Sequence, residues 1–243
     1  TSAPGDDAST GIWERVDPNG TAAQPEDDNS DGGTLCFVTG QGAPGGGLGD
    51  NDVDSGRTTL TSPTIDLSSG DAVIGYDRWF SNDTGGAPNE DAFVVEVSNN
   101  GGASWVNVET VGPTGDETSG GWFRNEFTVS DFVTPTADVQ VRFIASDEGT
   151  GSLVEAAIDE FKVFNLTCDD ACQPDLGFGG PGDLALSICG PLGTGDTAAF
   201  LVENATPFGQ VFVVIGFANS PTSFKGGLLV PVPISGLVVA PAD

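Results

Sequence analysis

The chain has 243 residues, of which 36 are acidic and only seven are Lys or Arg, so its formal net charge at neutral pH is −29. So negative a surface repels phosphate backbones and anionic lipids, which excludes nucleic acids and membranes as partners. No apolar run approaches the length that spans a bilayer. The chain also lacks His, which excludes Ser–His and Cys–His catalysis, and we expect it not to be an enzyme.

The composition favours an all-β protein. The 36 Gly and 16 Pro break helices, while 15 Phe and four Trp indicate a packed core rather than disorder. Short alternating segments bounded by turn residues are typical of an antiparallel β-sandwich or jelly roll. The predicted strands cover residues 72–80, 91–98, 104–109, 122–129, 138–145 and 156–166, and later 184–188, 198–202 and 211–218.

The periodicity divides the chain into four parts. Residues 1–10 lack any pattern and are expected to form a flexible N-terminal arm. Residues 11–166 are expected to form the jelly-roll sandwich, and the turn-rich residues 167–182 a linker. Residues 183–243 then form a small second β-domain, short enough to need a disulfide or a partner for stability.

Residue usage also predicts the compartment. The chain has no Met, so Thr1 is expected to be a processed terminus, left by removal of an export signal from a secreted or cell-surface protein. The four cysteines, an even number, are compatible with two disulfides. Three pairings are open, and we favour Cys36 with Cys168 and Cys172 with Cys189. Scattered cysteines without His make zinc binding the weaker interpretation.

Several phrases of the first domain occur in the order found in a known family. They are GIWERVDPNGT (11–21), DNDVDSGRTTLTSPTIDLS (50–68), YDRWFSND (76–83), VSNNGGASWVNVE (97–109) and VRFIASDEGTGSLVEAAIDEFKV (141–163). Residues 11–164 thus resemble a β-sandwich module appended to secreted bacterial metalloproteases of the immune inhibitor A type and to surface proteins. Its relatives are jelly rolls of the MAM and carbohydrate-binding kind. The resemblance implies a non-catalytic, calcium-stabilised module used in adhesion or glycan binding.

An aspartate pattern predicts where calcium binds. Asp50, Asp52 and Asp54 alternate in a loop that ends at Gly56, and such alternate carboxylates can converge on one ion. The loop is not an EF-hand, because the Gly comes one position late and Thr61 stands where the closing Glu belongs. A solvated acidic loop is the alternative. Further candidate ligands are Asp17, Asp83, Asp91 and Asp159.

Two features bear on glycans. Aromatic side chains can stack on sugars, and Trp13, Trp79, Trp122 and Tyr76 are available, although their alternation with polar residues favours burial in the core. Four sequons could carry glycans themselves, at Asn19, Asn82, Asn165 and Asn204.

The most apolar run of the chain, GLLVPVPISGLVVA (227–240), lies almost at its end. Pro231 and Pro233 place it at a sheet edge. It is either the last edge strand of its own domain or a donor strand for the sheet of a neighbouring copy, an arrangement that generates a head-to-tail filament. The apolar side chains of this segment are Leu228, Leu229, Val230, Val232, Ile234, Leu237, Val238 and Val239.

Two functions remain open. The interpretation that we prefer from sequence is a calcium-stabilised subunit of an extracellular filament or surface matrix, a homopolymer assembled by strand addition. The alternative is a carbohydrate-binding accessory module of a secreted hydrolase, which binds extracellular glycans. A glycosidase is disfavoured, because among 36 acidic residues some carboxylate pair meets by chance in any fold.

Overall fold

The computed structural model describes residues 3–149 and 151–165, with side chains through Phe164, and beyond them the backbone of six short strands between Ala185 and Pro241. The chain divides into two compact units, Thr1–Asn165 (unit 1) and Leu166–Asp243 (unit 2). Apart from one short 3₁₀ helix, η1 (Val129–Asp131), every regular element in the described part is a strand. No helix among the described residues has the length and apolar character needed to cross a membrane.

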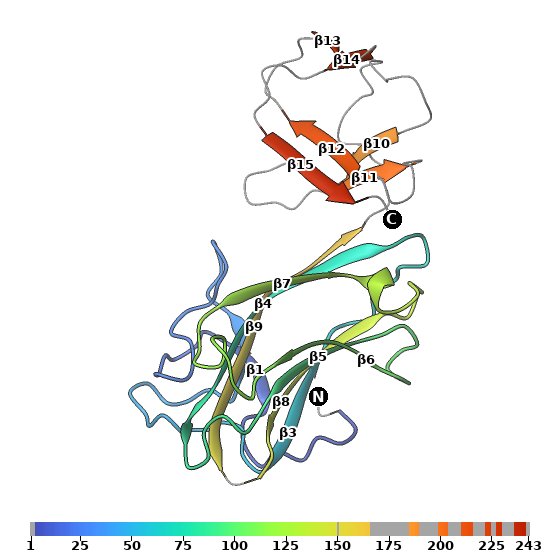
Figure 1. The fold of residues 1–243 in the computed structure, drawn as a ribbon. Coiled ribbons are helices and arrows are strands. Elements are labelled where there is room, and N and C mark those ends of the chain that lie inside the picture. The colour runs from blue at the N-terminus through green and yellow to red at the C-terminus, as the bar shows by residue number, and fades with distance from the viewer. Residues whose placement is uncertain are drawn as a thin grey trace. The chain divides into compact units, whose positions relative to one another are not determined.

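Unit 1 consists of two antiparallel sheets that face each other (Figure 1). The first sheet has the order β1-β2-β9-β4-β7 and the second the order β3-β8-β5-β6. The strands of the first sheet are β1 (Trp13–Val16), β2 (Cys36–Thr39), β9 (Ser152–Asn165), β4 (Ala72–Gly85) and β7 (Phe123–Thr128). Those of the second are β3 (Gly56–Thr61), β8 (Gln140–Asp147), β5 (Phe93–Ser98) and β6 (Val106–Val111).

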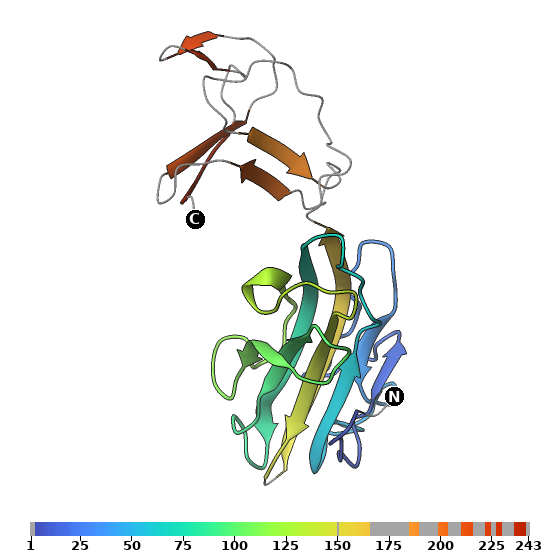
Figure 2. The same ribbon diagram turned by 90° about the vertical axis from the view of Figure 1, so that its right-hand side faces the viewer.

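This strand order confirms the predicted fold class. From β2 to β9 successive strands mostly change sheet, and β2-β9-β4-β7 faces β3-β8-β5-β6, which is the double Greek key of a jelly roll. The additional strand β1 extends the first sheet beside β2. Figure 2 shows the long strands β4 and β9 side by side, as their pairing over most of their length requires.

The hydrophobic core lies between the two sheets. It forms there because side chains that face the core alternate along each strand with side chains that face outward. In β5, Phe93, Val95 and Val97 are fully buried, whereas the residues between them are only half-buried. Phe143 of β8 lies at the centre of an aromatic cluster: its ring is 5.0 Å from that of Tyr76, edge to face, and 6.4 Å from that of Phe93. Such aromatic pairs add about 1 kcal/mol each beyond the area that they bury.

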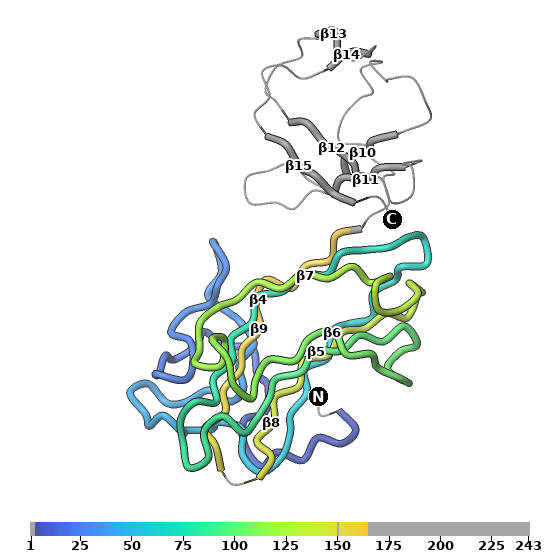
Figure 3. Tube along the Cα trace, viewed as in Figure 1, coloured from blue at the N-terminus to red at the C-terminus, as the bar shows by residue number. Residues whose placement is uncertain are grey.

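The N-terminal residues correct one prediction. Residues 3–10 are not a free arm but lie along β3 (Figure 3). The amide of Asp7 donates to the carbonyl of Arg57 at 3.1 Å, and the amide of Arg57 donates back to the Asp7 carboxylate at 3.0 Å. Asp6 accepts from the hydroxyl of Thr59 at 2.6 Å. The arm therefore covers the otherwise open edge of β3, which its lack of periodicity did not indicate.

In unit 2 the structure describes three strand pairs. They are β10 (Ala185–Cys189) with β11 (Ala199–Glu203), β12 (Gln210–Ile215) with β15 (Gly236–Pro241), and β13 (Thr222–Phe224) with β14 (Gly227–Leu229). Two of these pairs agree with the alternative interpretation of the terminal segment, an edge strand of its own domain, and give the donor-strand prediction no support. The described parts of segment 227–240 pair within their own chain, with Val213 opposite Val238 and Ser223 opposite Leu228. Val230, Val232 and Ile234 lie outside the described residues, as does the predicted linker 167–182.

Candidate functional site

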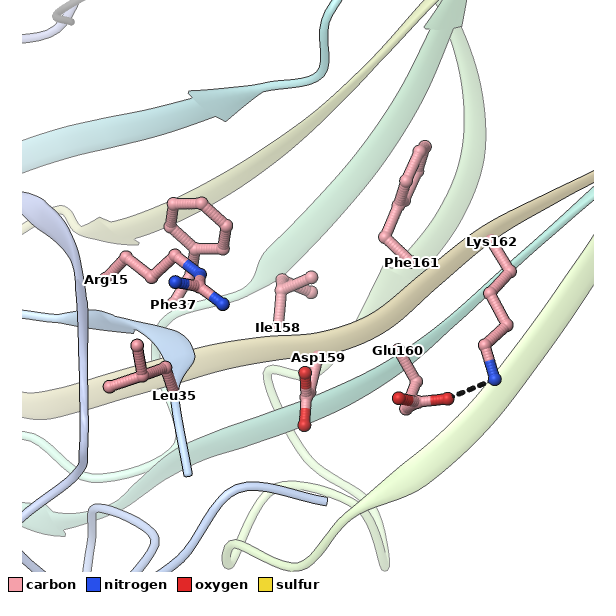
Figure 4. Close-up of a pocket in the computed structure, with 8 residues that line it drawn as sticks. All are labelled: Arg15, Leu35, Phe37, Ile158, Asp159, Glu160, Phe161 and Lys162. Atoms are coloured by element: carbon pink, nitrogen blue, oxygen red, sulfur yellow. Dashed lines mark ion pairs between the residues drawn. The ribbon is translucent and has the colours of Figure 1, made fainter. Parts of the chain in front are cut away.

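A pocket of about 280 Å³ opens beside β9, close to where β2 begins (Figure 4). Eight residues line it. Arg15 comes from β1, and Phe37 comes from β2, with Leu35 directly before that strand. The remaining five, Ile158–Lys162, are consecutive in β9. We call this site the Arg15 pocket.

Strand pairing explains why the pocket lies here. β2 pairs with β9 at only two positions, Phe37 with Ile158 and Val38 with Ala157. β9 continues to Asn165 on the β4 side, so its edge beyond Ile158 is not covered by β2. A long strand beside a short one thus leaves the side chains of Leu35 and Phe37 around an open stretch of β9.

A β-bulge shapes the floor of the pocket. Asp77 of β4 pairs with Asp159 and Gly75 pairs with Lys162, so two residues of β9, Glu160 and Phe161, oppose Tyr76 alone. Glu160 has a φ of +49°, a left-handed conformation that costs a residue other than Gly about 1 kcal/mol. Bulges re-aim side chains and are common beside functional sites. Figure 4 shows the result: Ile158 and Phe161 project from one side of β9, Asp159 and Glu160 from the other.

The charged side chains of the pocket differ in their partners. Lys162 pairs with Glu160, and Asp159 accepts a hydrogen bond from the amide of Asn29 at 2.8 Å. Burial raises the pKa of the Asp159 carboxyl, with smaller contributions from the charges of Asp28 and Glu160. Arg15 is exposed and makes no ion pair or side-chain hydrogen bond with any residue that the structure describes.

The apolar side chains complete the site. Phe37 and Phe161 are half-buried and Leu35 is 39% exposed, so all three offer apolar surface to a ligand. The Phe161 ring is fixed from behind by Phe143, edge to face at 6.1 Å between centroids. The acidic side chains leave β9 on the side opposite to Ile158 and Phe161 (Figure 4), so a ligand that contacts both kinds of group has to lie across the exposed edge of the strand. In that position the Arg15 pocket can offer donors, acceptors and apolar contacts to one ligand.

The predicted calcium ligands lie at different places. Asp52 is 5% exposed, and burial, followed by the charge of Asp54, raises its pKa to about 7. Asp91 is 4% exposed, and its Oδ1 accepts from the amide of Glu148 at 2.8 Å. Asp159 lines the Arg15 pocket, whereas Asp17, Asp50 and Asp83 are exposed. Within residues 3–149 and 151–164, no three Asp, Glu or Cys side chains are placed together as metal ligands would be. Calcium binding at Asp50, Asp52 and Asp54 stays a prediction from the sequence.

A buried acid, Glu155, was not predicted from the sequence. Its side chain is 2% exposed, and its Oε2 accepts from the hydroxyl of Thr39 at 2.9 Å and from Nε2 of Gln24 at 3.2 Å. Burial raises the pKa of Glu155 to about 9. Its place in the apolar run SLVEAAI (152–158) was the available signal, because such a run leaves no room for a solvated charge.

The structure corrects the prediction that the sequon at Asn82 could carry a glycan. Asn82 is fully buried, and its side-chain amide donates to the carbonyls of Asp91 at 2.7 Å and Pro113 at 3.1 Å, so it cannot carry a glycan in the folded chain. Asn19 is half-buried and donates to the carbonyl of Gly42 at 2.7 Å. Neither the Asn165 side chain nor Asn204 is among the described residues.

Cys36 is buried in β2, and burial raises its pKa to about 12. It forms no disulfide with any residue that the structure describes. Cys168 and Cys172 lie outside those residues, and only the backbone of Cys189 is described, in β10.

The four aromatic residues considered for glycan stacking are engaged within unit 1. Tyr76 is fully buried. Trp13 and Trp79 are half-buried and donate their indole N–H to the carbonyls of Thr58 at 3.3 Å and Ala23 at 2.6 Å. The Trp122 ring lies edge to face on Trp79 at 6.0 Å. The aromatic surface of the Arg15 pocket comes from phenylalanines instead.

No family model and no curated protein matches the chain. Among solved structures, the K3 cleaved adhesin domain of Lys-gingipain from Porphyromonas gingivalis is 14% identical, with a TM-score of 0.32, and the match covers 67% of this chain and 99% of that one. The module CBM27-1 of Caldicellulosiruptor saccharolyticus, solved with mannohexaose, is 13% identical, with a TM-score of 0.33 and coverages of 56% and 78%. The non-crystalline cellulose-specific carbohydrate-binding module CBM28 is 14% identical, with a TM-score of 0.32 and coverages of 62% and 86%. The jelly-roll assignment rests on the strand order of unit 1 and not on these likenesses.

Proposed function

We propose that unit 1 is a non-catalytic, extracellular carbohydrate-binding module that holds a saccharide in the Arg15 pocket. The filament proposal depended on a free apolar strand near the C-terminus, and the described parts of that segment are paired within their own chain. The alternative function named from the sequence is therefore the one that we adopt.

The state of Arg15 is the observation that carries this proposal. In a chain with 36 acidic and seven basic residues, an arginine has many carboxylates available. Arg78, Arg124 and Arg142 are each paired with one or more, and Arg57 donates to backbone carbonyls. Arg15 instead reaches into a pocket without such a partner (Figure 4). A guanidinium presents a planar set of N–H donors that suits adjacent oxygen acceptors, such as the neighbouring hydroxyls of a sugar.

The other lining residues supply what a saccharide further needs. Asp159 and Glu160 are acceptors for sugar hydroxyls. Phe37 and Phe161 offer apolar surface to the C–H face of a sugar ring. The fixed position of Phe161 against Phe143 means that little conformational entropy is lost when a ligand binds there.

We expect Arg15→Gln to weaken saccharide binding by about tenfold or more, since a hydrogen bond to a charged group contributes roughly 1.5–3 kcal/mol. A glycan array identifies the saccharides that the full chain binds, and titration calorimetry then compares the variant with the parent. The matched control is Arg57→Gln, because Arg57 lies outside the pocket and donates to the carbonyl of Gly5. Equal affinity of all three proteins would contradict the proposal.

Calcium stabilisation is a separate proposal that rests on the sequence pattern of Asp50, Asp52 and Asp54 alone. A ligand that binds only the folded state stabilises it by mass action, so we expect a chelator to lower the melting temperature of unit 1 by several degrees relative to millimolar calcium. Asp52→Asn should abolish this difference, whereas Asp66→Asn, at an exposed position, should preserve it. A melting temperature that does not respond to calcium would contradict the proposal.

A further inference from the structure

Arg124 of β7 does not line the Arg15 pocket, yet its guanidinium contacts the strand that forms the floor of that pocket. Arg124 pairs across the sheet with Asp77 of β4, and Asp77 in turn pairs with Asp159 of β9. Residues directly opposite one another in neighbouring strands project from the same face of a sheet. The three side chains therefore lie in one row that runs from β7 across β4 to β9.

The guanidinium of Arg124 spans this row. Its Nη1 donates to Oδ1 of Asp77 at 3.2 Å and to the main-chain carbonyl of Glu160 at 3.1 Å. Its Nε and Nη2 donate to Oε1 of Glu126, also in β7, at 3.2 and 3.1 Å. One side chain from β7 thus reaches across β4 and contacts the backbone of β9.

Glu160 is the residue of β9 whose backbone most needs such a contact. It lies in the bulge, where Glu160 and Phe161 oppose Tyr76 alone, and its φ of +49° is unfavourable for a residue with a side chain. A backbone in this conformation persists only where surrounding contacts fix it. The hydrogen bond from Arg124 supplies such a contact, since a change of φ at Glu160 would turn its carbonyl away from the guanidinium.

Gly75 makes room for the guanidinium. It lies in the interior of β4, two residues before Asp77 and therefore on the same face of the sheet. A Cβ at Gly75 would lie 2.9 Å from Cζ of Arg124 and 3.2 Å from Cγ of Glu126, well inside the 3.5–4.0 Å or so at which non-bonded carbon atoms pack. Glycine inside a strand often marks such a close approach. The missing side chain at Gly75 is therefore what lets Arg124 reach β9.

The loop between β1 and β2 ties down the other acid of the pocket floor. The side-chain amide of Asn29 donates to Oδ2 of Asp77 at 2.6 Å, and its backbone amide donates to Oδ2 of Asp159 at 2.8 Å. Asp77 is 7% exposed and joins Asn29 to Arg124, since each donates to one of its oxygens. Asp159 and Glu160, which project from the same side of β9 (Figure 4), are thus both connected to Arg124.

We infer that Arg124 is a positioning residue of the Arg15 pocket: it holds the bulge of β9 and thereby the two acids, Asp159 and Glu160, that accept hydrogen bonds from a ligand. The contact of these acids with a saccharide rests on the proposed function, whereas the hold of Arg124 on the bulge does not. Acceptors that are fixed before a ligand arrives lose little conformational entropy on binding. Without Arg124 the bulge samples other conformations, and only the fraction that fits can bind.

NMR of the full chain without ligand tests the hold on the bulge. In the parent, the coupling between the amide proton and Hα of Glu160 and its Cα shift should be those of a left-handed residue. We expect Arg124→Gln to move both towards the values of an extended strand. Gly75→Ala should do the same, because it displaces the guanidinium without removing any hydrogen-bonding group. Two controls should leave Glu160 unchanged: Arg142→Gln breaks an ion pair on the other sheet, and a Cβ at Gly32, as in Gly32→Ala, meets no atom within 4 Å.

Affinity is the second readout, measured by titration calorimetry with the tightest-binding saccharide of a glycan array that includes cellobiose, maltose and mannobiose. Arg124→Gln and Gly75→Ala should each bind about two- to tenfold more weakly than the parent, the cost of ordering one free side chain. Both controls should bind as the parent does.

The outcomes separate this inference from the proposed function. Glu160 signals that stay as in the parent in Arg124→Gln, or signals that change without any loss of affinity, would overturn the inference. A chain that binds no saccharide on the array, but whose Glu160 signals respond to Arg124→Gln and Gly75→Ala, would contradict the proposed function and support the hold of Arg124 on the bulge.

Discussion

Between pH 5 and pH 8 the free energy of unfolding of unit 1 is expected to fall by about 1.4 kcal/mol for each pH unit through Glu155 alone. The ordinary pKa of this carboxyl is 4.5, and burial raises it to about 9 in the folded chain. The folded state therefore holds a proton that the unfolded state has released. This contribution is fully present below the unfolded pKa and is lost as the pH rises towards the folded pKa. Asp52, with a pKa of about 7, adds to the slope in the lower part of the window.

Urea unfolding of the full chain in chelator, followed by tryptophan fluorescence, measures this slope. All four tryptophans lie within residues 13–122, so the signal reports unit 1 only. Glu155→Gln keeps an oxygen that can accept from Thr39 and Gln24 and should flatten the slope, whereas Glu148→Gln, at an exposed position, should not. Stability that stays constant from pH 5 to pH 8, or parallel curves for Glu155→Gln and the parent, would contradict the buried acid.

Phe143→Ala is expected to destabilise unit 1 by about 3–5 kcal/mol, since it leaves a cavity at the centre of the aromatic cluster. It should also weaken saccharide binding, because the Phe161 ring in the wall of the Arg15 pocket loses its support. The same urea unfolding gives the stability change, and calorimetry below the melting range gives the affinity.

Two further variants serve as controls for the effect of Phe143→Ala. Phe143→Leu should lose less stability because it leaves a smaller cavity. Val106→Ala should have almost no effect, since Val106 is 41% exposed on β6. If Phe143→Ala lowered stability yet left affinity unchanged, Phe161 would not depend on the core for its position.

The sequence predicted the long strands of unit 1 well, because their alternation is a local property. The segments predicted at 72–80, 91–98 and 138–145 correspond to β4, β5 and β8. The strands β1, β2 and β3 were not predicted, because β1 and β2 have only four residues each and β3 (GRTTLT) contains a single apolar side chain. Their pairing is fixed by contacts between distant parts of the chain, such as Trp13 opposite Thr39.

The candidate site was less predictable. Asp159 was singled out as a candidate calcium ligand, and it lines the Arg15 pocket. The bulge at Glu160 arises only when β9 pairs with β4. Whether Arg15 has an ion-pair partner depends on where every carboxylate lies in the folded chain. The sequon at Asn82 was misinterpreted, because the pattern of three residues does not show that its amide fastens a loop.

The most direct test of the Arg15 pocket is an NMR titration of the full chain with the saccharide that it binds best on a glycan array. We predict that the shifts include the side-chain Nε–H of Arg15 and the backbone amides of Phe37 and of residues 158–162. Binding that leaves all of these signals unchanged, or a chain that binds no saccharide on the array, would contradict the proposed function.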